Sequence, residues 1–132
     1  MKARVDHVGV VVASLERTGH FVRDVLGLEL ALEPPPLPGG VNTAFYGEGA
    51  RVELIQIADP QARERRLGDA EARVEHIALE VEDVLALIEQ LKAKGVRFTT
   101  DEPVRVRENL VVWTLPDTSA GVMWQLFSRA QP

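Results

Sequence analysis

The sequence predicts an α+β fold in which two tandem βαβββ modules form a curved, cupped mixed sheet, a half-barrel or barrel, with the helices outside. The main observation is an internal repeat. Residues 6–12 and 75–81 share an acid, a histidine, a β-branched, a small and an aliphatic residue in that order, 69 positions apart. Each segment precedes a helix-like stretch that ends in glycine, and residues 52–54 match residues 124–126. Duplication of a half-length unit explains all three matches, and chance similarity between amphipathic strands is the alternative.

Hydrophobic alternation predicts four strands in the first half, at residues 5–12, 28–32, 42–46 and 51–58. Ser14 is a suitable N-cap for a helix over about 15–26, which Gly27 ends. The proline-rich residues 34–40 form a loop, because proline lacks the N–H that a strand donates. Residues 47–50 contain two glycines between two strands and predict a hairpin turn.

The second half repeats this order, with strands expected at residues 74–82, 96–99, 110–115 and 121–128. Asp83 is the N-cap of its helix, and Gly95 ends it. The apolar stripe of this helix consists of Val84, Leu87, Ile88 and Leu91. The polar residues 59–73 connect the two halves and suit a short helix.

Length and composition suit one globular domain. The chain has 132 residues, of which 45% are hydrophobic and 27% charged. We therefore expect a single domain over residues 1–132, with module one at about 1–58, a connector at 59–73 and module two at about 74–130.

Charge and cysteine content exclude several classes of function. A net charge of -5 argues against binding to nucleic acid or to an anionic membrane. No apolar run approaches the ~20 residues of a membrane span, and no signal peptide is evident, so we expect a soluble cytoplasmic protein. The absence of cysteine excludes disulfides, thiolate metal ligands and a cysteine nucleophile.

Alternation along the strands sends four polar side chains to one concave face. On their strands, His7 and His76 point to the face opposite the apolar residues that pack on the helices. Each stands two positions before a small residue, Gly9 or Ala78. Glu53 shares its face with two isoleucines, and Gln125 shares its face with Met123 and Phe127. A carboxylate in an apolar strand is costly unless something compensates its charge.

A divalent metal ion would compensate this set of two histidines, a glutamate and a glutamine. The donors are nitrogen and oxygen without sulfur, which suits Co, Ni, Zn, Mn or Fe. Taken singly, His7 or His76 also fits a hydrogen-bonded core histidine, and Glu53 also fits a solvent-facing strand edge. Their repeated placement favours the metal site, with metal ligands His7, Glu53, His76 and Gln125.

Other polar residues are assigned to the surface. His20 has no counterpart in the second half and is expected on the surface or in helix packing. A cluster of arginines alternates with acids and predicts a solvated face, although it could also hold a phosphate or carboxylate; its members are Arg63, Arg65, Arg66 and Arg73. Arg105 and Arg107 are expected in a loop, where they would be exposed or would anchor an anionic substrate.

The paired modules, with histidine on the first strand of each and an acid or amide on the last, resemble the vicinal oxygen chelate (glyoxalase/bleomycin resistance/dioxygenase) superfamily. Residues 6–10, 24–28 and 75–81 are typical of it, and the resemblance covers nearly the whole chain. Within the superfamily, residues 36–41 and 52–55 are most similar to the methylmalonyl-CoA epimerases, and next to the glyoxalase I enzymes.

The resemblance implies an enzyme, commonly a homodimer, that uses a metal as Lewis acid. Such an isomerase, epimerase or lyase removes a proton next to a carbonyl of a small molecule with vicinal oxygens, thioesters among them. Glu53, or a hydroxide on the metal, would be the base. The sequence departs from the family at Gln125 and Thr43, where the relatives carry acids, and at residues 105–109, which replace a glycine-rich segment.

Two alternatives follow from these departures. A non-catalytic member of the bleomycin-resistance type would bind a small molecule in the same cleft, and Gln125 and Thr43 favour it. An extradiol dioxygenase would use two histidines and one carboxylate on iron. That carboxylate comes from the last strand in those relatives, where this chain has Gln125.

Overall fold

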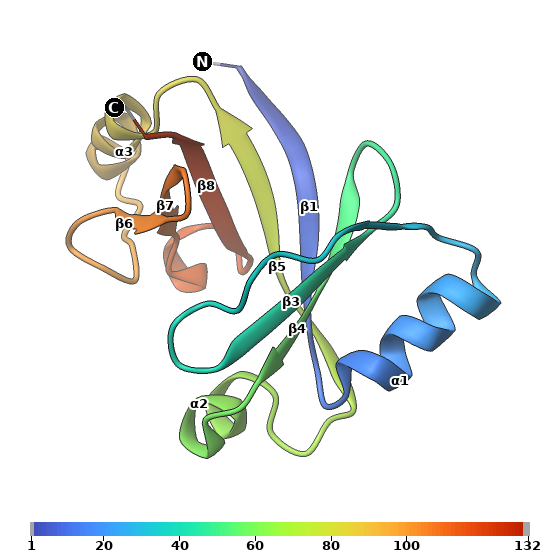
Figure 1. The fold of residues 1–132 in the computed structure, drawn as a ribbon. Helices are drawn as coiled ribbons and strands as arrows, with labels where there is room; N and C mark the ends of the chain where they lie inside the picture. Colours follow the sequence, from blue (N-terminus) through green and yellow to red (C-terminus); the bar gives the residue numbers. More distant parts are fainter. Residues whose placement is uncertain (1, 131–132) are drawn as a thin grey trace. The chain divides into compact units, whose positions relative to one another are not determined.

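The computed structural model describes residues 2–130. Its first βαβββ module consists of β1 (Ala3–Val12), α1 (Leu15–His20), η1 (Phe21–Val25), β2 (Leu30–Leu32), β3 (Val41–Tyr46) and β4 (Arg51–Ile57). After α2 (Pro60–Arg66), the second consists of β5 (Ala72–Val81), α3 (Val84–Ala93), β6 (Val104–Val106), β7 (Asn109–Trp113), η2 (Pro116–Thr118) and β8 (Met123–Arg129). The predicted α+β class and the tandem modules are therefore confirmed (Figure 1).

The eight strands form one mixed sheet in the order β2-β3-β4-β1-β5-β8-β7-β6. Parallel pairs join β1 to β4 and β5 to β8, and the remaining pairs within each half are antiparallel. The chain divides into two compact units, one of His7–Glu75 and one of Met1–Asp6 with His76–Pro132. No helix among residues 2–130 has both the length and the apolar character that crossing a bilayer requires.

In the unit His7–Glu75, α1 packs against β3 and β4 (Figure 1). The helix begins at Ser14, whose side chain accepts a hydrogen bond from the N–H of Arg17. The N–H of Leu15 donates to the side-chain oxygen of Gln56 at 2.7 Å, so the sheet also satisfies the helix start. The apolar core on this side consists of Val12, Val22, Ala44, Tyr46 and Leu54.

The other unit places α3 against β7 and β8 in the same manner. Asp83 caps the helix by accepting from the N–H of Ala86, and the N–H of Val84 donates to Ser128 Oγ at 3.0 Å. Its core consists of Val81, Val84, Ile88, Val112 and Leu126. The repeat thus extends to the hydrogen bonds at the two helix starts.

Three predicted elements differ from the observed ones. The helix over 15–26 is an α-helix only to His20 and then continues as a π-helix to Val25. Residues 96–99 are not a strand, because only Phe98 forms an isolated bridge, to Thr114, and the strand that pairs with β7 is β6. Arg105 consequently lies in a strand and not in a loop.

Candidate metal centre

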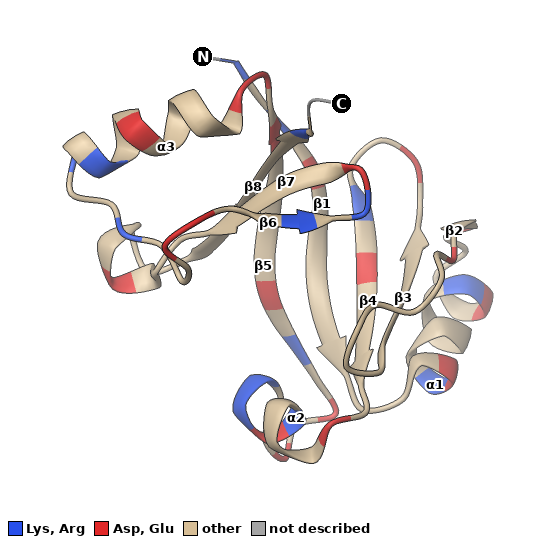
Figure 2. Ribbon diagram, turned by 60° about the vertical axis from the view of Figure 1, so that its left-hand side comes forward, with Lys and Arg blue, Asp and Glu red and all other residues tan. Residues whose placement is uncertain are grey.

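The parallel pairing of β1 with β4 brings His7 and Glu53 to one face of the sheet. Gly9 on β1 is the Cα partner of Glu53, and His7 lies two residues before Gly9, so alternation gives all three the same face. His7 Nε2 lies 3.2 Å from Glu53 Oε1, and the two side chains are only 6% and 10% exposed. Glu53 is the single acidic residue of β4, and Figure 2 shows an acidic (red) stretch on this strand.

Phe45 packs against the ring of His7. It is the Cα partner of Glu53 on the antiparallel neighbour β3, so it faces the same side. The rings of His7 and Phe45 meet edge to face, with centroids 5.3 Å apart and planes at 88°. The sequence interpretation did not identify Phe45, although the repeat gives a signal, because Trp113 stands opposite Gln125 as Phe45 stands opposite Glu53.

In the other unit, His76 and Gln125 also share a face. His76 is 4% exposed and is the Cα partner of Met123 on β8, and Ala78, two residues further along β5, is the Cα partner of Gln125. The side chain of Ala78 is small and completely buried. The predicted placement of both histidines beside small residues is thus observed.

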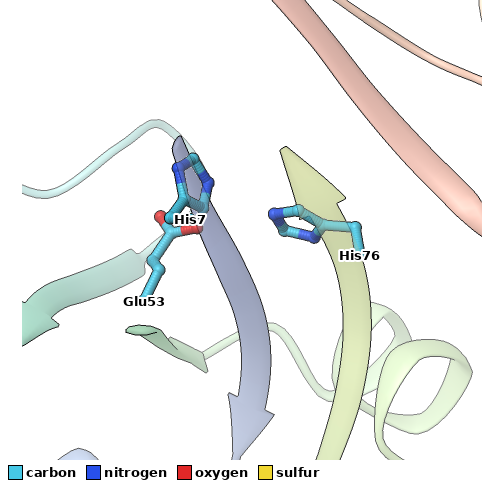
Figure 3. Close-up of side chains that lie close together, drawn as sticks. All are labelled: His7, Glu53 and His76. Atoms are coloured by element: carbon cyan, nitrogen blue, oxygen red, sulfur yellow. Dashed lines mark ion pairs between the residues drawn. The ribbon is translucent and has the colours of Figure 1, made fainter. Parts of the chain in front are cut away.

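Three of the four predicted ligands form a compact group. His7, Glu53 and His76 each offer one ligand atom, and these atoms lie within 4.8 Å of one another (Figure 3). Two imidazoles and one carboxylate fit a first-row divalent ion, and the burial of all three limits competing water. The role of Gln125 as fourth ligand stays a prediction.

Arg66 belongs to the arginine cluster that was predicted to form a solvated face or to hold a carboxylate, and its 37% exposed side chain is bound to an acid. Its guanidinium donates two hydrogen bonds to the Glu75 carboxylate, at 2.8 and 2.7 Å, and Glu75 directly precedes His76. The hydrogen bond to Glu75 raises the pKa of Arg66, and the charges of Glu75 and Glu53 raise it further. Both glutamates thus favour the charged form of the Arg66 guanidinium.

His20 lies on the surface, as predicted. Its side chain is 66% exposed and its Nδ1 lies 2.7 Å from an oxygen of Asp24, one helical turn further on. The adjacent Arg23, followed by His20, lowers the pKa of Asp24. Arg105 is exposed on β6, and Arg107 occupies the following turn with a φ of 53°.

Comparison with known proteins defines the class. Residues 6–112 match the Glyoxalase/Bleomycin resistance protein/Dioxygenase superfamily, and the chain belongs to this family. The mouse mitochondrial methylmalonyl-CoA epimerase is 30% identical over 128 residues, which cover 93% of this chain and 71% of that protein. The human mitochondrial enzyme is 28% identical over 131 residues, which cover 93% of this chain and 72% of that protein.

Solved structures give the same result. A methylmalonyl-CoA epimerase in complex with methylmalonyl-CoA and NH4+ superposes with a TM-score of 0.85 at 27% identity, covering 98% of this chain and 96% of that one. The Mycobacterium tuberculosis methylmalonyl-CoA epimerase gives 0.84 at 25% identity, covering 97% and 89%. The predictions of this superfamily and of an enzyme of the epimerase type, which acts by proton abstraction next to a carbonyl, are confirmed.

Proposed function

We propose that this protein epimerises methylmalonyl-CoA, or an acyl-CoA with the same pairing of thioester and carboxylate, at the carbon between the two groups. The observation that carries the proposal is the buried carboxylate of Glu53, 3.2 Å from His7, in a chain related to methylmalonyl-CoA epimerases. The carbon next to a thioester carbonyl is the type of acid that a positioned carboxylate can deprotonate.

His7, Glu53, His76 and Gln125 would hold a divalent ion, one of Co, Ni, Zn, Mn or Fe. When bound, the ion would supply Lewis-acid polarisation of the substrate carbonyl. The buried nitrogen and oxygen donors of His7, Glu53 and His76 support this assignment. The two imidazoles bind through neutral nitrogen, and Glu53 contributes the negative charge.

Glu53 would be the base. Among the residues of β1, β3 and β4, it is the single acid on its face of the sheet, because Asp6 alternates to the other face. Its Oε2, the oxygen not directed at His7, would take the α proton while the C–H electron pair enters the enolate. Neither Gln125 nor Thr43 can accept a proton. Inversion would therefore need a proton from solvent on the opposite face, so solvent exchange should be at least as fast as inversion.

Incubation of one methylmalonyl-CoA epimer in deuterated water tests the proposal directly. The metal-loaded protein should incorporate one deuterium at the α carbon, detected by mass spectrometry, before or together with loss of stereochemical purity. Protein stripped with a chelator is the control and should do neither. Absence of exchange after loading with each of the five metals would refute the proposed substrate.

Elemental analysis tests the metal assignment independently of turnover. Protein purified without chelators should contain about one divalent ion per chain, and His7→Ala or His76→Ala should lower its metal affinity at least ten-fold. If the wild-type protein is metal-free and takes up no Ni, Co or Zn, the non-catalytic binding protein becomes the better assignment.

We further propose that the two modules act as one domain within a cytoplasmic homodimer. The support is the exposure of five large hydrophobic residues in the short segment from η1 to the edge strand β2: Phe21, Val25, Leu26, Leu30 and Leu32. Monomeric proteins seldom leave such a patch uncovered. Light scattering coupled to size exclusion should give about twice the mass of one chain, and Leu32→Glu should shift the protein toward monomer.

A further inference from the structure

Thr43 is a buried polar residue whose hydroxyl the fold leaves unused. The residue is 3% exposed, and its Oγ1 has no hydrogen-bond partner among residues 2–130. A buried hydroxyl that has lost its water without gaining a partner destabilises the protein. Such a group in the middle of a strand requires an explanation.

The strand register gives Thr43 the same face as the candidate metal centre. Thr43 on β3 is the Cα partner of Ile55, and Phe45, two residues on, is the Cα partner of Glu53. Alternation therefore turns Thr43, Phe45 and Glu53 to one side of the sheet. Diagonal neighbours across an antiparallel pair are about 7–8 Å apart, so one small ligand can contact both side chains.

The second half of the chain contains an internal control for this position. Gln125 corresponds to Glu53 and Phe127 to Ile55, so the residue paired with Phe127, Val111, corresponds to Thr43. Val111 is 2% exposed and packs with Ala78 and Phe127. Valine has the same shape as threonine and no hydroxyl, so the framework does not require a polar atom at this position.

A second buried threonine shows how the same fold treats a structural hydroxyl. Thr114 is 2% exposed, and its Oγ1 accepts hydrogen bonds from Ser119 Oγ at 2.8 Å and from the N–H of Trp124 at 3.0 Å. Thr114 is therefore hydrogen-bonded within its own unit. Thr43 lacks such partners and is the exception among the buried threonines.

From these observations we infer that Thr43 is a substrate-binding residue, whose hydroxyl donates a hydrogen bond to an anionic oxygen of the ligand held at His7 and Glu53. The inference rests on the proposed function and adds a specificity determinant to it. The ligand class is a small carbonyl compound with a second oxygen group, such as a carboxylate, at a distance of one or two carbons. Thr43 binds this oxygen and takes no part in proton transfer, because a threonine hydroxyl does not act as a base at neutral pH.

The test compares Thr43→Val, which removes only the hydroxyl, with Thr43→Ser, which retains it. Oxalate is the binding probe, measured by calorimetry on nickel-loaded protein, because it presents two carboxylate oxygens without any reaction. Thr43→Val should weaken oxalate binding about 10–100-fold, the range for a hydrogen bond to a charged group, and Thr43→Ser should remain within about three-fold of wild type. Equal affinity in Thr43→Val, or no oxalate binding to wild type, would overturn the inference.

A stability measurement separates this role from a structural one. The midpoint of urea unfolding of the metal-free protein should be unchanged or higher in Thr43→Val, because the hydroxyl contributes no bond to the fold. A clearly lower midpoint would assign the hydroxyl to folding and contradict the inference. If oxalate binding depends on Thr43 while methylmalonyl-CoA shows no solvent exchange, the proposed substrate fails and the role of Thr43 stands.

Discussion

The two halves of the chain share their framework and differ in the chemistry of one face. Their helices begin with side-chain caps at equivalent positions, Ser14 and Asp83, and each first helical N–H donates to the last strand of its own module. At the face that carries the histidines, however, Glu53 corresponds to Gln125. One half therefore holds a carboxylate where the other holds an amide of nearly the same shape.

This difference separates two tasks that a symmetric pair would share. Both halves supply a buried histidine and a side-chain oxygen, so both can contribute to binding a metal ion. Of the corresponding pair Glu53 and Gln125, only Glu53 can accept a proton. Among residues 2–130, the first half alone has an unsatisfied buried threonine hydroxyl on that face. The comparison predicts that metal binding depends on both halves, whereas proton transfer depends on the first.

The largest expected effect comes from Glu53→Gln, which makes the two halves alike. A general base contributes about 10²–10⁴-fold in rate, so the variant should lose solvent deuterium exchange by that factor. Exchange at the α carbon of methylmalonyl-CoA is the measurement, with metal content determined on the same samples. If the Glu53→Gln variant turns over substrate at a rate close to that of the wild type, Glu53 is not the base.

The exchanged double variant, Glu53→Gln with Gln125→Glu, is the matched control, because it keeps composition and net charge. If only the number of carboxylate ligands mattered, it would regain activity. We expect it to bind metal like the wild type and to stay at least about 100-fold slower, because the base has moved to the wrong half. Recovery to within ten-fold of wild type would mean that the position of the carboxylate is not decisive.

Most of the fold and the grouping of His7, Glu53 and His76 could be predicted from the sequence, because the two halves repeat the same strands and the same buried faces. Strand alternation fixes the face of His7, Glu53 and His76, and the caps fix where the helices begin. The strand expected at 96–99 was wrong because a single alternating segment cannot distinguish a strand from one isolated bridge. The sequence also could not predict which side chains pair across different elements. The hydrogen bond from Arg66 to Glu75, for example, depends on how α2 folds back on β5.

That ion pair gives the next prediction, because each of the two compact units has one arginine bound to a glutamate on β5. Arg66 and Glu75 have side-chain exposures of 37% and 13%, whereas Arg4 and Glu80 are 70% and 44% exposed. Arg66→Met keeps the apolar stem but leaves a mostly buried carboxylate without its guanidinium. Allowing for solvent screening, this should lower the free energy of unfolding by about 1–2 kcal/mol.

Arg4→Met is the control and should leave the urea midpoint unchanged, because an exposed pair contributes little. The pKa of Arg66 is raised in the folded state, so its stabilisation is complete below the unfolded pKa and is lost only as pH rises through the still higher folded value. The difference between Arg66→Met and wild type should therefore be the same at pH 7 and pH 9. If Arg66→Met and Arg4→Met change the urea midpoint equally, the burial of an ion pair does not determine its contribution to stability.

The smallest effect concerns the two helices, where Gly19 of α1 corresponds to Ile88 of α3. Ile88 packs into its core, whereas a Cβ at Gly19 would meet Tyr46 Oη at 2.6 Å. Gly19→Ala gains up to ~1 kcal/mol of helix propensity but loses about 1–3 kcal/mol to the clash, so a net loss near 1 kcal/mol is expected. In a Tyr46→Phe background the nearest remaining atom is the ring carbon at 3.5 Å, an ordinary contact. There the same substitution should stabilise the protein, and this change of sign in urea unfolding distinguishes a steric role of Gly19 from a need for backbone flexibility.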